Sequence, residues 1–367
     1  MTQALAAQQW CRRFDHQVVG VLAGLPPSRS WPAYFEHGFD VPVTRLVSPA
    51  MTYRSGRSFD LPATLWSLVR QAGAFRRSVA TLRDAVRRTQ PDLIVNFLEP
   101  IVGLAGLGAD LGVPVLSVGH HFMLRHPAFP TATVSGLQTF GLHRYVDFAG
   151  RNSVHYGLSF YEAGDLPAAE LLVGPPLLRD ELLALAGQPA GDHLLVYLLN
   201  AGYRSDIERW HRRRPEVPLH VFYDRAGAPE EEAVDSTLTF HRLNAGKFLR
   251  FMATARGVAC TAGFESVCEA AWLGKPVLAV PVQNHVEQQL NAVDAEDAGI
   301  ATGAGSFELD RLLEATSGHA HERFQAWVAQ SDLRFLRAIH YTVSSRRNRI
   351  SPAAVPTPES LVPQSGR

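Results

Sequence analysis

The stretch TAGFESVCEAAWLGKPVLAVPVQNHVEQQLNA, residues 261–292, decides the fold that we expect for this chain. It reads as a glycine turn, a helix from about Phe264, a buried strand, and a polar loop that leads into another helix. Gly263 permits a tight turn, or close approach of another backbone, because it has no Cβ atom. The free N–H groups and the dipole of the following helix then favour a bound anion such as a diphosphate.

Polar side chains of this stretch are expected to meet at one edge of a sheet. Ser266 lies in the first helical turn and can donate a hydrogen bond to a phosphate. Glu269 shares its helix face, where a carboxylate can accept hydrogen bonds from a ribose diol. The next strand runs parallel and delivers Glu287 and Gln288 to the same rim. Each residue alone could be an ordinary turn, helix-surface or loop residue, but their order predicts a site for a nucleoside diphosphate-sugar.

Composition narrows the classes of function. Lys and Arg total 35, as do Asp and Glu, so the net charge is zero and bulk electrostatic binding of nucleic acid is not expected. The cysteines Cys11, Cys260 and Cys268 offer neither a disulfide framework nor metal-ligand spacing, so we expect no metal and no cofactor. Such sparse cysteines are typical of a reducing compartment, so we expect a cytoplasmic protein. The sequence has no signal-peptide pattern at its N-terminus and no apolar run of about 18–20 residues that would span a membrane.

Helix and strand patterns alternate along the chain and then restart. With 367 residues, two domains are the default. Residues 1–174 form the first α/β series, Pro175 and Pro176 mark a boundary, and residues 175–321 form the second. We expect an α/β protein with two Rossmann-like domains that face each other across a cleft. A long helix is predicted over 322–342, and residues 343–367, rich in Pro and Ser, are predicted to be disordered.

The spacing of the opening stretch also matches a known pattern. Gly263, Ser266 and Glu269 are followed by Gly274-Lys-Pro276, Pro281, Glu287-Gln288 and Asn291-Ala292. This order resembles the donor-binding signature of glycosyltransferases with the GT-B fold, including the lipid-linked N-acetylglucosaminyltransferase of peptidoglycan synthesis. The resemblance implies a diphosphate bound by Ser266 and the turn, a ribose bound by Glu269 and a donor sugar bound by Glu287 and Gln288. The full set of implied donor-binding residues is Asn200, Ala201, Gly202, Leu243, Thr261, Ala262, Gly263, Ser266, Glu269, Glu287, Gln288 and Asn291.

The same resemblance implies an activity. It implies metal-independent, inverting transfer of a sugar from a nucleotide-sugar, such as a UDP-sugar, to an acceptor that could be lipid-linked. It also implies that the helix at 322–342 crosses back to the first domain. Two other functions stay open on the same fold: a nucleotide-sugar 2-epimerase, and a nucleotide-sugar-binding protein without catalytic activity.

The start of the chain departs from the family pattern. Relatives open with a strand and a glycine-rich loop that ends in Gly-His, followed by a helix that begins much like MTQALA here. Either the native protein is longer than this sequence, or it lacks the loop and its histidine. Without a first central strand, two neighbouring strand edges would be exposed, which favours aggregation. We therefore expect a longer native protein.

Catalysis by an inverting transferase needs a base that removes the proton of the acceptor hydroxyl. Glu99, His120 and His121 each follow a predicted strand and are our candidates, although each could be a plain polar loop residue. Side chains of adjacent residues alternate in direction, so we expect one of the two histidines to face the cleft.

A second feature bears on the location of the acceptor. Residues 51–90 contain eight arginines and two aspartates among apolar residues. They could form a basic amphipathic helix that contacts the anionic inner face of a membrane, or a core-packed helix with a solvated face.

Overall fold

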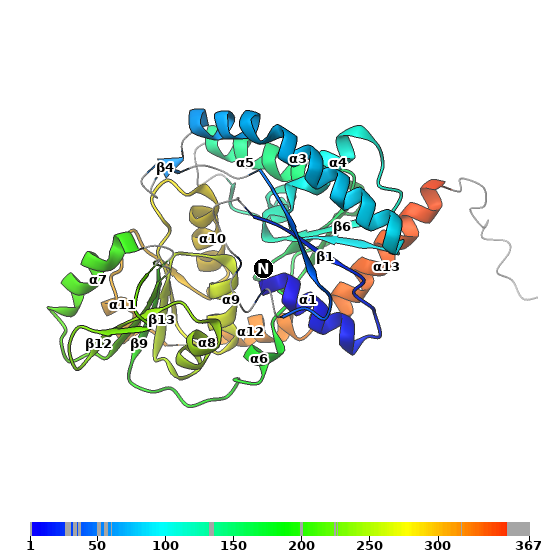
Figure 1. The fold of residues 1–367 in the computed structure, drawn as a ribbon. Coiled ribbons are helices and arrows are strands. Elements are labelled where there is room, and N and C mark those ends of the chain that lie inside the picture. The colour runs from blue at the N-terminus through cyan, green and yellow to red at the C-terminus, as the bar shows by residue number, and fades with distance from the viewer. Residues whose placement is uncertain are drawn as a thin grey trace, which may run out of the picture.

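The computed structural model shows a protein of two α/β halves side by side (Figure 1). The residues that the structure describes are 2–25, 31, 35, 38–49, 53–54, 58–59, 61–131, 136–198, 201–223, 225, 227–316 and 318–350. The helices and strands of the N-terminal half are α1 (Thr2–Arg13), β1 (Val21–Gly24), β2 (Val43–Leu46), β3 (Tyr53–Arg54), β4 (Ser58–Phe59), α3 (Leu61–Thr89), β5 (Ile94–Asn96), α4 (Pro100–Gly108), β6 (Val115–Gly119), η1 (His120–Arg125), α5 (Gly136–Ala149), β7 (Val154–Leu158), η3 (Pro167–Ala169) and β8 (Leu171–Gly174).

The C-terminal half begins after the proline pair. Its elements are α6 (Asp180–Leu183), β9 (Leu194–Leu198), η4 (Ala201–Tyr203), α7 (Arg204–His211), β10 (Leu219–Tyr223), β11 (Glu231–Ala233), β12 (Leu238–Arg242), α8 (Ala245–Thr254), β13 (Gly257–Cys260), α9 (Phe264–Trp272), β14 (Val277–Ala279), α10 (Val286–Asp297), β15 (Thr302–Gly303), α11 (Asp310–Glu314), α12 (His319–Val328) and α13 (Ser331–Ile350).

One sheet organises the C-terminal half. Its seven strands lie in the order β11-β12-β10-β9-β13-β14-β15, and every neighbouring pair is parallel except β11 with β12. Strand β13 is buried along its whole length, as its run of small and β-branched residues predicts. Because the carboxyl ends of parallel strands share one edge, the loops after β9, β12, β13 and β14 gather there.

The strands of the N-terminal half form separate sheets. Strands β5, β6, β7 and β8 make a four-stranded parallel sheet, whereas β1 pairs only with β2 among the described strands. All four residues of β1 are partly exposed, unlike the buried strand β6. The Gly24 amide donates a hydrogen bond of 3.1 Å to the Glu99 carboxylate. Because Gly24 ends β1 and Glu99 follows β5, the carboxyl ends of the two sheets lie next to each other.

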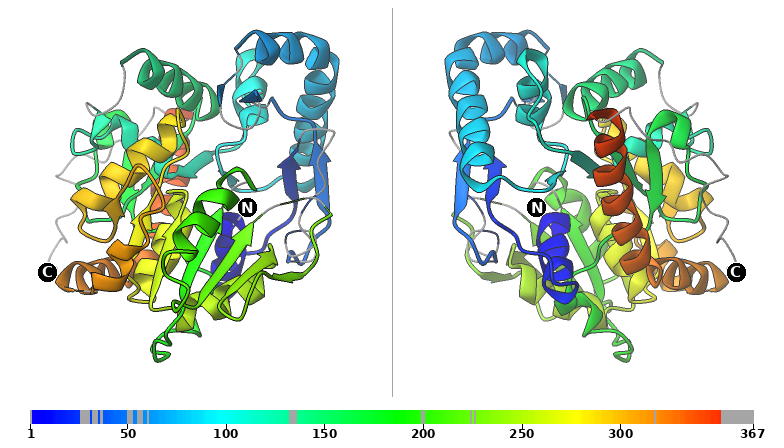
Figure 2. Two further views of the ribbon diagram at one scale, coloured as in Figure 1. Left: turned by 90° about the vertical axis from the view of Figure 1, so that its left-hand side faces the viewer. Right: turned by 90° about the vertical axis from the view of Figure 1, so that its right-hand side faces the viewer.

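The C-terminal helices differ from the expectation of one long helix. The chain forms α12, which packs on α9, and then α13, which packs on β6 and β8 of the N-terminal half (Figure 2). The second helix therefore crosses to the first half. It continues to Ile350, so the prediction that disorder begins at residue 343 is wrong for residues 343–350. The rest of that predicted tail, 351–367, lies outside the described residues.

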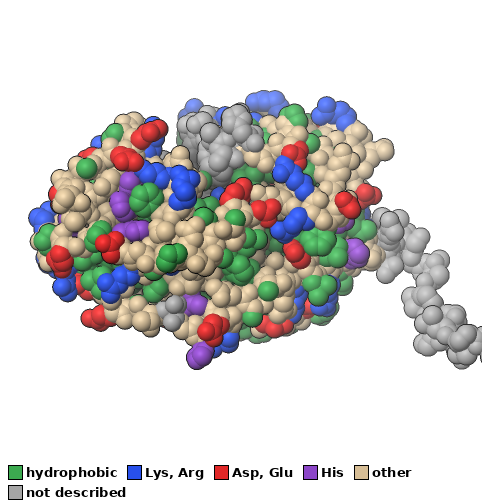
Figure 3. All heavy atoms as spheres, turned by 90° about the horizontal axis from the view of Figure 1, so that it is seen from below, with side chains coloured by type: hydrophobic (Ala, Val, Ile, Leu, Met, Phe, Trp, Pro, Cys, Tyr) green, Lys and Arg blue, Asp and Glu red, His purple; other side chains and the backbone are tan. Residues whose placement is uncertain are grey.

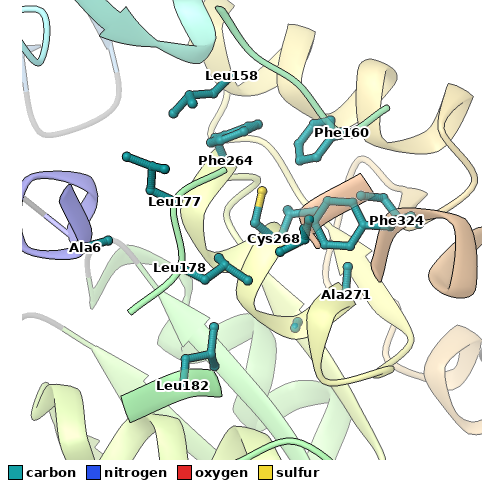
Figure 4. Packing of buried hydrophobic residues seen from close by; sticks show 14 of the residues in the cluster. Ala6, Leu158, Phe160, Leu177, Leu178, Leu182, Phe264, Cys268, Ala271 and Phe324 are labelled. Carbon is teal, nitrogen blue, oxygen red and sulfur yellow. The ribbon is translucent and has the colours of Figure 1, made fainter. Parts of the chain in front are cut away.

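An apolar core joins the two halves. Leu177 and Leu178, in the segment between them, pack between α1 and α9 in one cluster with Phe264 (Figure 4). Residues from both sheets, such as Leu116 and Leu195, belong to this cluster. Burial of a large apolar side chain stabilises by roughly 1.5–3 kcal/mol, so this core ties the halves together.

The surface agrees with the balanced charge of the sequence. Acidic and basic side chains are interspersed on the face shown in Figure 3. Within the described part of the chain, no helix is both long enough and apolar enough to cross a membrane.

Candidate functional site

The turn between β13 and α9 presents free backbone donors. Gly263 is the N-cap residue of α9, and no side chain in the described part of the chain caps the first N–H groups of this helix. A Cβ atom placed on Gly263 would meet nothing within 4 Å, so a ligand can approach the backbone there. The strained residue of the turn is Ala262, with φ 53°, rather than Gly263, whose φ is −71°. Of the two uses of Gly263 that the sequence left open, the turn itself does not require a glycine at this φ, whereas the open backbone suits close approach of an anion.

The two polar residues that the sequence placed on one face of α9 lie in different surroundings. Ser266 is partly exposed in the first turn. Glu269 is buried, and its Oε1 accepts a hydrogen bond of 2.6 Å from Nη2 of Arg179. Burial raises the pKa of Glu269, and the Arg179 guanidinium opposes that rise. Sequence reasoning missed Arg179, which is distant in sequence and carries no motif.

Two amide side chains of α10 hold the neighbouring loops in place. Asn291 donates a hydrogen bond of 3.1 Å to the carbonyl oxygen of Ala262, which fixes the turn before α9. Gln288 accepts one of 2.8 Å from the backbone N–H of Val282, after β14. Both side chains are buried, so in this structure they support the shape of the rim.

Glu287, the third predicted site residue of α10, contacts the other half of the protein. Oε1 of Glu287 lies 3.2 Å from Nε2 of His121, and the two side chains are 37% and 22% exposed. Although burial opposes the change, the charge of Glu287 raises the pKa of His121. A histidine from η1 and a carboxylate from α10 thus form a pair between the halves.

The adjacent histidine, also in η1, lies in different surroundings. His120 is buried, and its ring stacks on Phe264 with 4.2 Å between ring centroids. This stacking places η1 directly against the N-terminus of α9. Of the two candidate histidines, only His121 has a partly exposed side chain.

Glu99, the third candidate base, serves as a local anchor. Its carboxylate caps α4 by accepting a hydrogen bond from the Ile101 N–H, and it also accepts from Ser48 Oγ and the Gly24 N–H. Burial raises its pKa, while the Ser48 hydroxyl opposes the rise. Four groups of the N-terminal half are held together in this way.

The remaining predicted donor residues lie at the carboxyl edge of the C-terminal sheet. Gly202 in η4 is exposed, Leu243 directly after β12 is 37% exposed, and Thr261 after β13 is buried. Ala201 begins η4, and Asn200 lies outside the described residues.

Two of the candidate bases and two of the predicted donor-binding residues line one small cavity. Its volume is about 10 Å³, and its lining includes His120, His121, Glu287 and Asn291. This is room for about one water molecule. Among the described residues, no group of three His, Cys, Asp or Glu side chains is arranged to hold a metal ion.

Comparison with known families and structures agrees with this architecture. The family model described as "Glycosyl transferase family 1" matches residues 30–314. No curated protein sequence matches the chain significantly.

Solved structures resemble the whole chain at low identity. A glycosyltransferase of Arabidopsis thaliana, crystallised with UDP-L-rhamnose, has a TM-score of 0.60 at 15% identity, with 94% of this chain and 95% of that chain covered. The calicheamicin glycosyltransferase CalG4 has a TM-score of 0.58 at 14% identity, covering 95% and 96% of the two chains. An enzyme of Medicago truncatula, complexed with UDP-glucose, has a TM-score of 0.53 at 13% identity, covering 95% of each chain.

Proposed function

The chain belongs to glycosyl transferase family 1, and from that premise we propose that it moves a sugar from a UDP-sugar to an acceptor hydroxyl. The expected GT-B fold, with two Rossmann-like domains, is confirmed by its structural relatives. The nucleotide in the proposal is supported by the two plant relatives, which were crystallised with UDP-sugars. We propose further that the transfer needs no metal and inverts the anomeric carbon.

The uncapped N-terminus of α9 carries this proposal. This terminus lies at the carboxyl edge of a parallel sheet, where ligands of such folds bind. Its free N–H groups can donate hydrogen bonds to a diphosphate. Ser266 adds a hydroxyl to the same turn. Positive partial charge at this terminus would stabilise the diphosphate leaving group as the bond to the sugar breaks.

The histidine and carboxylate beside this terminus supply the acceptor chemistry. With Nε2 of His121 directed at Glu287, the ring can donate to that carboxylate and accept a proton at Nδ1. An acceptor hydroxyl deprotonated there can attack the sugar from the side opposite the diphosphate. That single displacement would give inversion.

Ser266→Ala tests the donor site. We expect UDP and UDP-glucose to bind about 10-fold more weakly, because a hydrogen bond to a charged group contributes roughly 1.5–3 kcal/mol. Isothermal titration calorimetry in the presence and absence of EDTA measures this change and the metal dependence together. Ser205→Ala, an exposed serine at the start of α7, is the matched control. Equal affinities for all three proteins would refute the role of Ser266.

We also propose that the acceptor side of the enzyme contacts an anionic membrane through the start of α3. Trp66 and Val69 are 64% and 71% exposed there, beside the exposed Arg70, while Phe75 and Leu82 on the other face are buried. The proposed membrane contact therefore uses the exposed face of α3, while the opposite face packs in the core.

Vesicle sedimentation tests this contact. The protein should sediment with vesicles that contain anionic lipid, and Trp66→Ser should lower the vesicle partition coefficient by at least about 10-fold, because a buried aromatic contributes roughly 1.5–3 kcal/mol. Leu333→Ser removes an equally exposed apolar side chain on α13 and should leave the partition coefficient unchanged. Identical sedimentation of the two variants would argue against this surface.

A further inference from the structure

A buried histidine and a buried aspartate face each other where the two halves meet. Nε2 of His120, from η1, lies 3.5 Å from Oδ2 of Asp294, from α10. The side chains are 5% and 0% exposed, and neither of these two atoms has a hydrogen-bond partner among the residues that the structure describes. Buried polar atoms are normally paired, so two unpaired atoms that face each other call for an explanation.

The hydrogen bond on the other side of the His120 ring fixes its tautomer. Nδ1 lies 2.7 Å from the carbonyl oxygen of Leu158, which can only accept, so Nδ1 carries a hydrogen. In the neutral ring, Nε2 is then an acceptor. An ionised Asp294 would direct a second acceptor at it, because Oδ1 is already occupied by the Tyr161 hydroxyl at 2.9 Å. One added proton turns this repulsive contact into a hydrogen bond.

The surroundings determine where that proton resides. Burial raises the pKa of Asp294 to about 7, against the Tyr161 hydrogen bond, whereas burial lowers the pKa of His120 to about 3. The carboxyl group therefore holds the proton and donates it to the imidazole. The titratable groups that act on the pair from the packed elements are Tyr161, Asp297, Cys268, His121 and Glu287.

We propose that Asp294 and His120 share one proton between the two halves, and that this proton holds α10 against η1. Asp294 and Glu287 are about two turns apart on one face of α10, and they meet the adjacent residues His120 and His121. The His120–Asp294 pair thus holds His121 and Glu287 opposite each other, so Asp294 is a positioning residue. Tyr161, also from the N-terminal half, strengthens the same contact. This inference does not depend on the identity of the donor or the acceptor.

The direction of the pH effect follows from linkage. The pKa of Asp294 in the folded protein lies above that of an unfolded aspartate, about 3.9. Its contribution is therefore complete at low pH and is lost as the pH rises through about 7. Above that pH, the two acceptors repel each other and the interface loosens.

Hydrogen–deuterium exchange tests the proposal without any substrate. In the wild-type protein, exchange in η1 and α10, corrected for the intrinsic rate, should rise about 10-fold between about pH 6 and about pH 8.5. Asp294→Asn should abolish this rise, because an amide N–H can donate to Nε2 at every pH. Asp297→Asn, an exposed neighbour on the same helix, should retain the rise, with its midpoint at a slightly lower pH because the Asp297 charge raises the pKa of Asp294. A wild-type protein without the rise, or an Asp294→Asn variant that retains it, would overturn the proposal.

Histidine ring nitrogen NMR on the wild-type protein adds a test that needs no variant. The Nε2 resonance of His120 should shift as the pH passes about 7, while Nδ1 stays protonated. A resonance that is constant over this range would equally overturn the proposal, even if the Asp294 variants fail to fold.

Discussion

Replacing His121 by alanine is expected to lower kcat by about 10³-fold while the affinity for the nucleotide stays within about 2-fold. The first number follows because a positioned general base contributes roughly 10²–10⁴-fold to the rate. The second follows because the ring contacts Glu287 of α10 rather than the uncapped turn at Gly263. Steady-state kinetics with a UDP-sugar and an acceptor, combined with UDP titration, separates the two effects.

A variant of Glu287, the partner of His121, tests the role of His121 more specifically than loss of activity does. The base must be neutral to accept a proton, so kcat should rise with pH through the pKa of His121. Because Glu287 raises that pKa, Glu287→Gln should move the acidic limb of the pH–rate profile to lower pH. His340→Ala, an exposed histidine on α13, should change neither quantity. A profile that does not move in Glu287→Gln would exclude His121 as the base.

Local pattern was sufficient to predict several elements of the C-terminal half, although not the break between α12 and α13. Strand β13, the start of α9 at Phe264 and the location of Glu287 beside the rim follow from periodicity, glycine placement and parallel topology. Local pattern does not predict which residues from distant parts of the chain will be in contact. Nothing near Glu269 in the sequence indicates Arg179, and nothing near His120 indicates Asp294, because each pair forms only when distant elements pack.

Less of the N-terminal half could be predicted from the sequence. The strands that precede Glu99 and His120 and the basic helix α3 were predicted, but the division of this half into separate sheets depends on which strands pair. Among the described strands, β1 and β5 each lie at an edge of their sheet. Glu99, expected to be catalytic from its position after a strand, turned out to link the two sheets at that point.

Replacing Glu269 by alanine is expected to destabilise the protein by about 3–5 kcal/mol, the range for removing one partner of a buried ion pair. The side chains of Arg179 and Glu269 are 11% and 7% exposed, so water cannot replace the lost carboxylate. The effect should be seen as a lower midpoint of urea unfolding. Glu181→Ala, which removes an exposed carboxylate that also acts on Arg179, should change the stability by less than about 0.5 kcal/mol.

A double variant separates stability from ligand binding at this residue. Arg179→Met with Glu269→Leu removes both charges, and replacing a buried pair by apolar side chains is often close to neutral, so most of the lost stability should return. If Glu269 also accepts hydrogen bonds from the ribose, as its place in the signature implies, this stable double variant should bind UDP at least about 10-fold more weakly. If instead the double variant is stable and binds UDP as the wild type does, the role of Glu269 is to anchor α9 to the segment between the halves, and the ribose is bound by other residues of the rim.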